Sequence, residues 1–455
     1  MRGSRPSAVG PQGRVTRSPV WAVPGARALA GEDHDYDKLL DQIGDRRFVL
    51  LGEGSHGTHE FYRERAVITR RLIEEKGFHA VAIEADWPDA YRVNRFVLGA
   101  SDDLDATASL DDFRRFPAWM WRNVDVVHFV TWLRAHNDAV ASQADKVRFY
   151  GLDLYSLRAS MEAVVDYLDA VDPDAASDAR RRYACFDLAG TEGHDYGRVV
   201  SLHPSTSCKE EVIQELLDLQ KRSTSILIRD GRAAADEYFF AEQNARLVHN
   251  AERYYREMYF GRVSSWNLRD RHMAETLENL AGHLDRQVGR SKIVVWEHNS
   301  HVGDARATEM GRFGELNVGQ LVRSAWEDDC TLVGFTTSSG WVTAASEWGS
   351  DAERKRVRPA AAGSYEHYFH DSHRGAFYLP LGPSSPDPLH GPLLERAIGV
   401  IYRPETERVS HYFQARLATQ FDAVIHIDET SAVEPLERSA AWEQGELAET
   451  YPSGL

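Results

Sequence analysis

Short apolar runs separated by helical patterns outline the predicted fold. Five runs read as strands, at residues 46–51, 79–84, 147–153, 292–296 and 331–335. Helical patterns follow most of them, at 58–76, from 86 onward, at 124–142 and at 318–326. Strands that alternate with helices pair in parallel through crossover helices. We therefore predict an α/β fold with a mostly parallel sheet flanked by helices, and further short strands at 377–381, 397–402 and 423–427.

The largest change of pattern is a nearly continuous helical stretch at 156–290. We expect a large helical insertion between strands of one sheet, which forms a wall or lid of a cleft. The α/β core then divides into residues 32–155 and 291–430. We interpret residues 1–31 as a mobile leader, since the first thirty residues hold five arginines and no acidic residue. Residues 431–455 form a C-terminal tail in this division.

Charge and cysteine content narrow the class of protein. The net charge is −17, from 53 basic and 70 acidic residues, which disfavours nucleic acid and anionic membranes as partners. No run approaches the roughly 18 apolar residues of a membrane helix. Cys185, Cys208 and Cys330 show neither a CxxC metal pattern nor a disulfide framework, which is typical of a reducing compartment. We expect a cytoplasmic protein, and the sequence does not indicate its oligomeric state.

Ionisable and aromatic residues stand directly after four predicted strands. Parallel strands share one carboxyl edge, and ligands bind in the crevice outside that edge. These residues are therefore expected to gather at one site: Glu53 and His56; Glu84 and Asp86; Asp153 and Tyr155; Glu297, His298 and His301.

This set of side chains is suited to the activation of water. A neutral imidazole such as that of His56 can accept a proton from water near neutral pH, and a neighbouring carboxylate, Glu53 or Glu84, can orient it. His298, His301 and Arg65 can bind or polarise an ester carbonyl. Hydrolysis of an ester by direct water attack needs no further group.

Several alternatives remain open at this level. Ser55 stands beside His56, although the segment lacks the GxSxG nucleophile signature. Arg65 falls on the inward stripe of its helix and needs a carboxylate partner there, unless it reaches past the helix edge to solvent. Asp153 either contacts substrate, as we also expect of Tyr155 and Trp121, or caps the next helix.

Three segments, in order, resemble the erythromycin esterase family. They are Leu51–Glu60, Ile83–Trp87 and Trp296–Val302, with Leu316–Leu321 as a weaker fourth, and the resemblance spans roughly residues 35–430. It implies an α/β fold with a helical insertion that hydrolyses a macrolide lactone by activated water, without a serine nucleophile. By the same resemblance, the general base is His56, and the other site residues are Glu53, Glu84, Arg65, His298 and His301.

One departure from the family pattern concerns Glu297. Macrolide esterases tend to carry a small residue before the HNxH motif, so this carboxyl is expected to change the pKa of His298 or the choice of substrate. We predict a carboxylic ester hydrolase that needs no cofactor and no metal, with a small-molecule ester as its partner. A metal-dependent hydrolase using the same cluster and a non-catalytic, haem-like binder are the alternatives, and a role in antibiotic resistance follows only if macrolides are cleaved.

Overall fold

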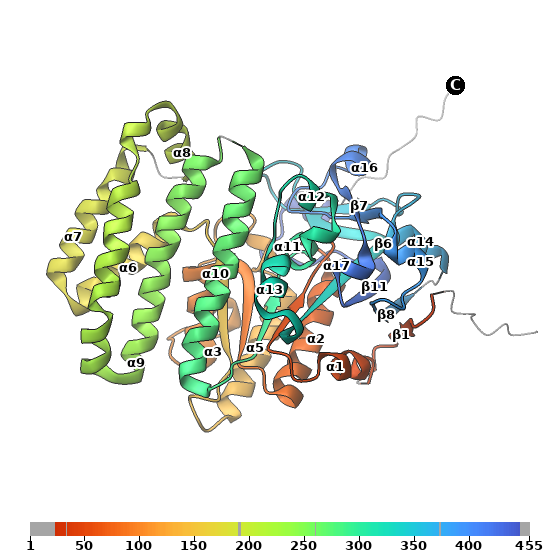
Figure 1. The fold of residues 1–455 in the computed structure, drawn as a ribbon, viewed down its shortest axis with the longest axis horizontal. Helices are drawn as coiled ribbons and strands as arrows, with labels where there is room; N and C mark the ends of the chain where they lie inside the picture. Colours follow the sequence, from red (N-terminus) through yellow and green to blue (C-terminus); the bar gives the residue numbers. More distant parts are fainter. Residues whose placement is uncertain (1–22, 33, 190–192, 260, 373–374, 446–455) are drawn as a thin grey trace, which may run out of the picture.

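The computed structural model describes residues 23–445 except 33, 190–192, 260 and 373–374 (Figure 1). Within them, nine strands form one sheet in the order β1-β8-β11-β6-β2-β5-β3-β4, with β7 paired to β6, and β9 pairs with β10 in a second sheet. The strands are β1 (Arg27–Ala28), β2 (Phe48–Leu51), β3 (Ala80–Asp86), β4 (Arg148–Asp153), β5 (Ile293–Trp296), β6 (Cys330–Ala344), β7 (Glu353–Val357), β8 (Ala376–Pro380), β9 (Leu393–Arg396), β10 (Tyr412–Ala415) and β11 (Ala423–Thr430).

The centre of the large sheet is parallel. The neighbouring pairs β11/β6, β6/β2, β2/β5, β5/β3 and β3/β4 all run in the same direction, while β1, β7 and β8 are antiparallel additions. Phe48 and Leu50 point into one hydrophobic cluster, and Val49 and Leu51 point into another. A strand buried on both faces needs an unbroken apolar run, which is why the sequence revealed these strands so clearly. The predicted fold class is confirmed.

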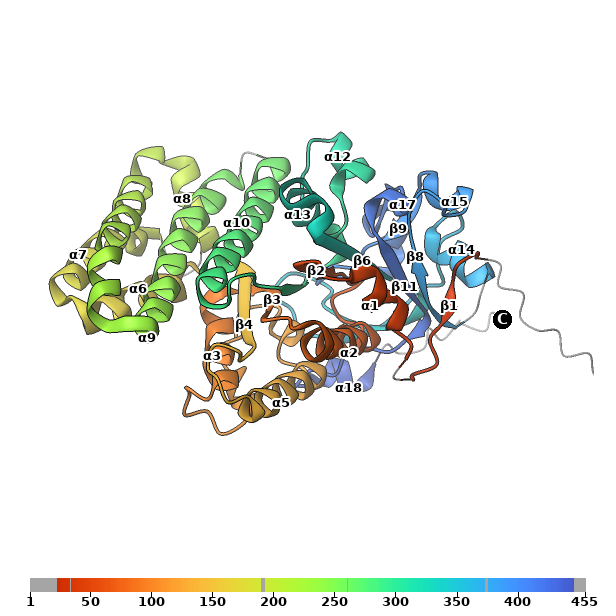
Figure 2. The same ribbon diagram turned by 60° about the horizontal axis from the view of Figure 1, so that its bottom comes forward.

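Helices cover both faces of the sheet. Figure 2 shows α1, α2 and α5 on one side and α10 and α13 on the other. The helices of the core are α1 (Asp37–Ile43), α2 (His59–Lys76), α3 (Trp87–Leu98), α4 (Ala106–Ser109), α5 (Val124–Ala139), α11 (Asn299–Val302), α12 (Glu309–Arg312), α13 (Val318–Trp326), α14 (Tyr365–Ser372), α15 (Asp387–His390), α16 (Glu407–Ser410), α17 (Leu417–Gln420) and α18 (Ala440–Gln444). Gly77 ends α2 in the left-handed conformation, as predicted.

The segment between β4 and β5 is helical and extends beyond the β4 edge of the sheet, in yellow and green in Figure 1. Its helices are α6 (Leu157–Val171), α7 (Pro173–Tyr183), α8 (Gly193–Leu202), α9 (Lys209–Glu257) and α10 (Arg262–Val288). The two halves of α9 lie side by side. Hydrogen bonds between them show this: the Tyr238 hydroxyl donates to the Leu219 carbonyl, and Gln220 donates to Glu242. Helix α10 returns to the sheet, where it packs against β4.

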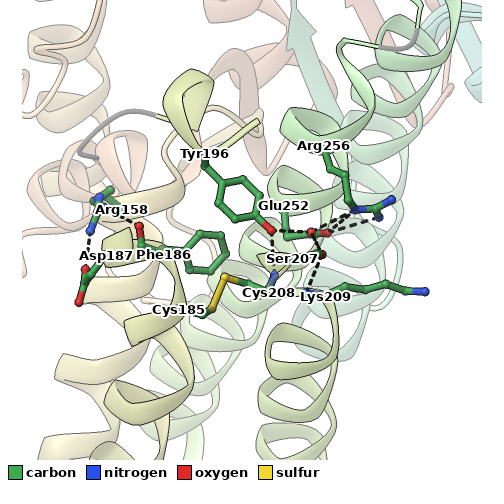
Figure 3. Close-up of a disulfide and its surroundings, with 10 residues drawn as sticks. All are labelled: Arg158, Cys185, Phe186, Asp187, Tyr196, Ser207, Cys208, Lys209, Glu252 and Arg256. Carbon is green, nitrogen blue, oxygen red and sulfur yellow. Dashed lines mark hydrogen bonds and ion pairs between the residues drawn. A yellow bond between two sulfur atoms is a disulfide. The ribbon is translucent and has the colours of Figure 1, made fainter. Parts of the chain in front are cut away.

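A disulfide joins Cys185 to Cys208 within this helical segment, with 5.8 Å between the Cα atoms (Figure 3). The sequence-based expectation of unpaired cysteines is wrong. The start of α9 packs against the segment after α7, and this brings together two cysteines that are 23 residues apart. Beside the disulfide, the buried carboxylate of Glu252 accepts hydrogen bonds from Tyr196 and Ser207, at 2.7 Å each. The cysteines therefore give no support to a reducing compartment.

The strands predicted from the sequence differ from the observed ones in some peripheral segments. Residues 397–402 form two isolated bridges instead of a strand, and β7 and β10 were not predicted. Their residues are partly exposed and mixed in character, so no apolar run marks them. Residues 1–22 of the expected leader and 446–455 of the expected tail lie outside the described residues. No described helix has the length and apolarity to cross a membrane.

Candidate active site

A cavity of about 760 Å³ opens at the carboxyl edge of the parallel strands. Most of the predicted site residues line it. They are His56, Glu84, Trp121, Asp153, Tyr155, His298 and His301. Glu53 and Arg65 stand behind His56, with at most 1% of their surface exposed. The cavity lies where strand order reverses around β2 and β5, which is the expected position for a ligand.

The loop after β2 holds His56 in place through a buried chain of contacts. His56 Nδ1 lies 2.9 Å from Glu53 Oε1, and Arg65 Nη2 donates to Glu53 Oε2 at 2.6 Å. Arg65 therefore pairs with Glu53, and the alternative in which it reaches solvent is wrong. Because Nδ1 faces a carboxylate, it carries the proton, and Nε2 of neutral His56 is left as the acceptor. Glu53, rather than Glu84, orients this imidazole.

Glycine is required in this loop for close packing. A Cβ atom at Gly52 would meet the side chain of Asn299, and one at Gly57 would meet the backbone of Thr343. Asn299 uses the space beside Gly52 to bind β6. Its Nδ2 donates to the Phe335 carbonyl at 2.8 Å, and its Oδ1 accepts from the Phe335 backbone amide at 3.1 Å. The β2 and β5 loops are therefore fixed against the same strand.

The loop after β5 brings a second imidazole next to the first. The ring centroids of His298 and His56 are 4.8 Å apart. Nδ1 of His298 accepts a hydrogen bond from the Ser300 backbone amide, so the proton of the neutral ring is on Nε2. Burial and the neighbouring His56 hold the pKa of His298 well below its usual range. His298 thus carries a neutral N–H donor on Nε2, an atom that is buried and has no hydrogen-bond partner among the described residues.

His301 is held in a different environment. Its Nδ1 lies 2.8 Å from the carboxylate of Asp270, and its ring stacks on Trp266 at 4.6 Å between centroids. Burial by itself would lower the pKa of His301, but the carboxylates of Asp270 and Glu84 outweigh it and raise the pKa to about 9. His301 therefore carries a positive charge at neutral pH.

Arg269 links the strand ends to the helical segment. It donates to both oxygens of Asp153, at 3.0 and 2.7 Å, and to Glu84 Oε1 at 2.7 Å. Its Nη1 lies 3.1 Å from His301 Nε2. A largely buried guanidinium with two buried carboxylates is a stable arrangement only when all members are present. Arg269 therefore couples β3, β4 and β5 to α10.

Glu84 is a structural anchor of this network. Besides Arg269, it accepts the backbone N–H of His298 at 2.9 Å and lies 3.4 Å from His301 Nε2. Burial alone would raise the pKa of Glu84, but His301, His56 and Arg269 outweigh it and hold the pKa well below its usual range. Glu84 is thus an ionised group that fixes the two loops and is a poor base.

The three residues expected to contact substrate differ in the contacts that their side chains already make within the protein. Trp121 lines the cavity and donates its indole N–H to the Glu84 carbonyl at 3.1 Å. The ring of Tyr155 lies between two guanidinium groups, with Arg115 at 4.7 Å and Arg269 at 5.0 Å. Asp153 is committed to Arg269 and caps no helix, since Ser156 is the N-cap of α6.

The structure also bears on two alternatives, a serine nucleophile and a metal site. Ser55 pairs with the Thr58 hydroxyl beneath the loop and is absent from the cavity lining, so it is not placed as a nucleophile. Within the described ranges, no three or more His, Cys, Asp or Glu side chains are grouped as metal ligands. The Nδ1 atoms of His56 and His301 face carboxylates, and Arg269 contacts both His301 and Glu84.

Sequence reasoning missed Trp266, Arg269 and Asp270, which all lie on one face of α10. One signal was available. Asp270 stands in the helical stripe that continues with Met273, Leu277, Leu280 and Leu284, all fully buried. A carboxylate on such a stripe needs a buried partner. Which partner it meets could not be read from the chain, because His301 is 31 residues away.

Comparison with known proteins adds a family and two groups of similar chains. Residues 73–430 match the family model described as Erythromycin esterase. Erythromycin esterase type II of Escherichia coli is 27% identical over 335 residues, which cover 68% of this chain and 73% of the relative. Putative hydrolase YbfO of Bacillus subtilis is 23% identical over 424 residues, covering 88% and 87%.

Two solved structures share the fold. A succinoglycan biosynthesis protein superposes with a TM-score of 0.72 at 20% identity, covering 90% of this chain and 96% of that one. A mutant of the erythromycin esterase EreC in its open conformation superposes with a TM-score of 0.66 at 16% identity, again covering 90% and 96%. At these identities the likeness concerns the fold alone.

Proposed function

Because the chain belongs to the erythromycin esterase family, and is on that ground a hydrolase, we propose that it cleaves a carboxylic ester, of the macrolide lactone type, by water that His56 activates. The observation that carries the proposal is a pair of adjacent histidines, His56 and His298, that line one cavity and are oriented as an acceptor and a donor. His56 is oriented as an acceptor by Glu53, and His298 is oriented as a donor by Ser300.

His56 is the general base in this proposal. Its Nε2 takes a proton from water, and Glu53 stabilises the imidazolium that forms, while Arg65 holds Glu53 in place. A base of this kind needs a fixed carboxylate behind it, in the manner of other carboxylate–histidine pairs. No serine takes part.

The carbonyl oxygen of the ester is bound by His298 Nε2–H. That N–H is oriented before substrate arrives, which is the arrangement that stabilises a developing oxyanion most effectively. The positive charges of His301 and Arg269 lie behind it and are balanced by Glu84, Asp153 and Asp270. Their contribution is to hold the loop that carries His298.

The atoms balance without a covalent enzyme intermediate. The water oxygen forms a bond to the carbonyl carbon as its proton moves to His56. The tetrahedral species then loses the alkoxide, which receives the proton from His56, and the acid and alcohol are released. For a lactone both products are one molecule, the ring-opened hydroxy acid.

The test is incubation of the protein with a panel of macrolides and simple lactones, followed by mass spectrometry. We expect a gain of one water in at least one member, dependent on His56. If the protein hydrolyses simple lactones but no macrolide, it is an esterase and the assignment of macrolides as its substrates is wrong. If it hydrolyses neither the macrolides nor the simple lactones, the proposed reaction is contradicted.

A further inference from the structure

The Cys185–Cys208 disulfide joins the two segments that lie on either side of Tyr196 in α8. Cys185 belongs to the short 3-10 helix η2 (Ala184–Ala189), and Cys208 directly precedes α9. Figure 3 shows Tyr196 between them. The ring of Phe186 lies 4.8 Å from the Tyr196 ring between centroids, and the Cys208 backbone N–H donates to the Tyr196 hydroxyl at 2.9 Å. The disulfide therefore fixes both sides of the site in which Tyr196 is buried.

Helix α8 relies on these contacts because it buries few side chains of its own. It has 10 residues, and its buried positions are Gly193, Tyr196, Gly197 and Val200. A helix of this length is marginal in isolation, and glycine is a poor helix former. The two glycines instead allow close packing on Tyr255 of α9, since a Cβ atom at Gly193 would meet the Tyr255 ring and one at Gly197 the Tyr255 carbonyl oxygen. The neighbouring segments thus determine where α8 lies.

The contacts of α8 continue to the wall and the rim of the active-site cavity. Tyr255, on which α8 packs, donates its hydroxyl to the backbone carbonyl of Tyr155 at 3.1 Å, and Tyr155 lines the cavity. The ring of His194 lies 5.4 Å from the Tyr255 ring and 6.2 Å from the ring of Trp348, between centroids. Trp348 stands between β6 and β7 and also lines the cavity. Helix α8 therefore connects the disulfide to two separate parts of the cavity lining.

The buried carboxylate of Glu252 provides a second connection between the same places. It accepts hydrogen bonds from Tyr196 and Ser207, at 2.7 Å each, and from Arg256 Nε at 3.1 Å. Ser207 precedes Cys208, and Glu252 stands three residues before Tyr255 on α9. A carboxylate with 1% of its surface exposed is costly to leave without these partners, so a shift beside the disulfide is transmitted along α9 toward Tyr255.

We propose that the Cys185–Cys208 disulfide is a redox-sensitive site that controls the active-site cavity. While the disulfide is intact, α8 is held against Tyr255 and Trp348. Its reduction releases α8 and loosens the part of the wall that contains Tyr155. The effect on α8 is independent of the reaction catalysed, whereas the effect on turnover rests on the proposed function.

The reductant in this proposal is a dithiol. Its thiolate attacks Sγ of Cys185, which is only partly buried, while Cys208 is fully buried. A mixed disulfide forms, and Cys208 leaves as a thiolate that takes up a proton. The second thiol of the reductant then displaces Cys185 and closes a disulfide within the reductant. Two electrons and two protons pass from the dithiol to the two cysteines.

Hydrogen–deuterium exchange of the folded protein, with and without dithiothreitol, tests the control of α8 without relying on hydrolysis. Alkylation first counts the free thiols, which should rise from one to three on reduction, because Cys330 is the free cysteine of the three. We expect the backbone amides of α8 to exchange about tenfold faster after reduction, and those of α5 to be unchanged.

Two variants are compared in the same measurement. Cys185→Ser removes the disulfide and keeps the buried Cys208, so α8 should exchange fast with or without dithiothreitol. Cys330→Ser is the matched control, which retains the disulfide and should respond to dithiothreitol like the parent. A disulfide that resists dithiothreitol in the folded parent is a permanent cross-link and overturns the proposal. So does exchange in α8 that is unchanged on reduction, or an increase that is equally large in α5.

Kinetics on the ester found by the panel gives a second readout. We expect reduction to raise KM about tenfold and to leave kcat and its pH profile nearly unchanged, because the cavity wall moves while His56 and Glu53 do not. Cys185→Ser should show the raised KM under both conditions, and Cys330→Ser should behave like the parent. A KM that does not change on reduction contradicts control of the cavity. If no ester is cleaved, the proposed function fails, and hydrogen exchange still decides whether the disulfide controls α8.

Discussion

The β2 corner of the site (Glu53, His56 and Arg65) and the β5 corner (Glu84, Asp270 and His301) each contain a histidine paired with a carboxylate, but the two histidines have different surroundings. His56 Nδ1 lies 2.9 Å from Glu53, and His301 Nδ1 lies 2.8 Å from Asp270. In the β2 corner, Arg65 binds the carboxylate and leaves the far side of the imidazole to the cavity. In the β5 corner, Arg269 lies 3.1 Å and Glu84 lies 3.4 Å from the far nitrogen, and the carboxylates of Asp270 and Glu84 raise the pKa of His301 to about 9.

The difference shows that a carboxylate–histidine pair does not specify a role by itself. What lies on the second ring nitrogen decides whether the histidine takes up a proton or holds one. His56 has the open side that a base needs, and His301 has the charge that supports an oxyanion site. Removing members of each corner should therefore have unequal effects.

The largest effect is expected from His56→Ala. Loss of the base should lower kcat by about a thousandfold or more, because general-base catalysis accounts for about 10²–10⁴ of the rate. Steady-state kinetics on the ester found by the panel measures this, and circular dichroism and thermal unfolding check the fold. A well-folded variant with undiminished turnover would exclude His56 as the base.

Arg269→Met should give the largest loss of stability. It leaves Glu84 and Asp153 buried without their partner, which costs about 3–5 kcal/mol in the free energy of unfolding. Denaturant unfolding measures this. Arg180→Met breaks the exposed pair with Asp169 and serves as the control, with an expected cost of about 1 kcal/mol or less. Similar losses in both variants would mean that α10 is not anchored by Arg269.

Asp270→Asn should reduce activity less than loss of His56. The amide cannot hold His301 in its charged form, so the oxyanion site weakens and kcat falls by about a hundredfold. Because His56 and Glu53 are untouched, the base remains functional. If Asp270→Asn lowers kcat as much as His56→Ala does in the same assay, the separate roles of His301 and His56 are contradicted.

The pH dependence of stability gives a further comparison. The pKa of His301 is about 9 in the folded protein and 6.5 ordinarily. Protonation therefore favours the folded state. The contribution is fully present below about pH 6.5 and is lost as the pH rises through about 9. The difference in free energy of unfolding between the parent and Asp270→Asn should shrink between about pH 6 and pH 10. A difference that stays constant would contradict a charged His301.

Glu297→Gln should have the smallest effect. Burial holds the pKa of Glu297 well above its usual range, which favours the neutral side chain, and neither oxygen has a hydrogen-bond partner among the described residues. We expect activity within about twofold of the parent. Glu84→Gln is the matched control, since Glu84 is ionised and bonded, and should be severely impaired. A large effect at Glu297 would support its direct influence on His298.

The β2 corner could be read almost completely from the sequence. Glu53, His56 and Arg65 lie within thirteen residues, on one loop and the helix that follows it. The strands were equally legible, because burial on both faces requires continuous apolar runs. The inward position of Arg65 followed from helical periodicity, and the structure then showed which carboxylate it meets.

The β5 corner could be read only in part. Its histidines follow a strand and were predicted, but their partners lie on α10, in a segment whose packing no local pattern specifies. The same limit applies to Cys185 and Cys208 and to the strands at the edge. In each case the decisive contact joins residues that are distant in the chain.

The sequence by itself thus determined the parallel sheet, the edge at which the ionisable residues gather and the closeness of His56 to Glu53 in the loop after β2. These depend on local periodicity and on the shared direction of strand ends. Only the tertiary structure decided the state of each histidine, the anchoring of α10 by Arg269 and the pairing of Cys185 with Cys208. Protonation and ion pairing depend on all charges within a few ångström, and those charges are brought together only when the chain is folded.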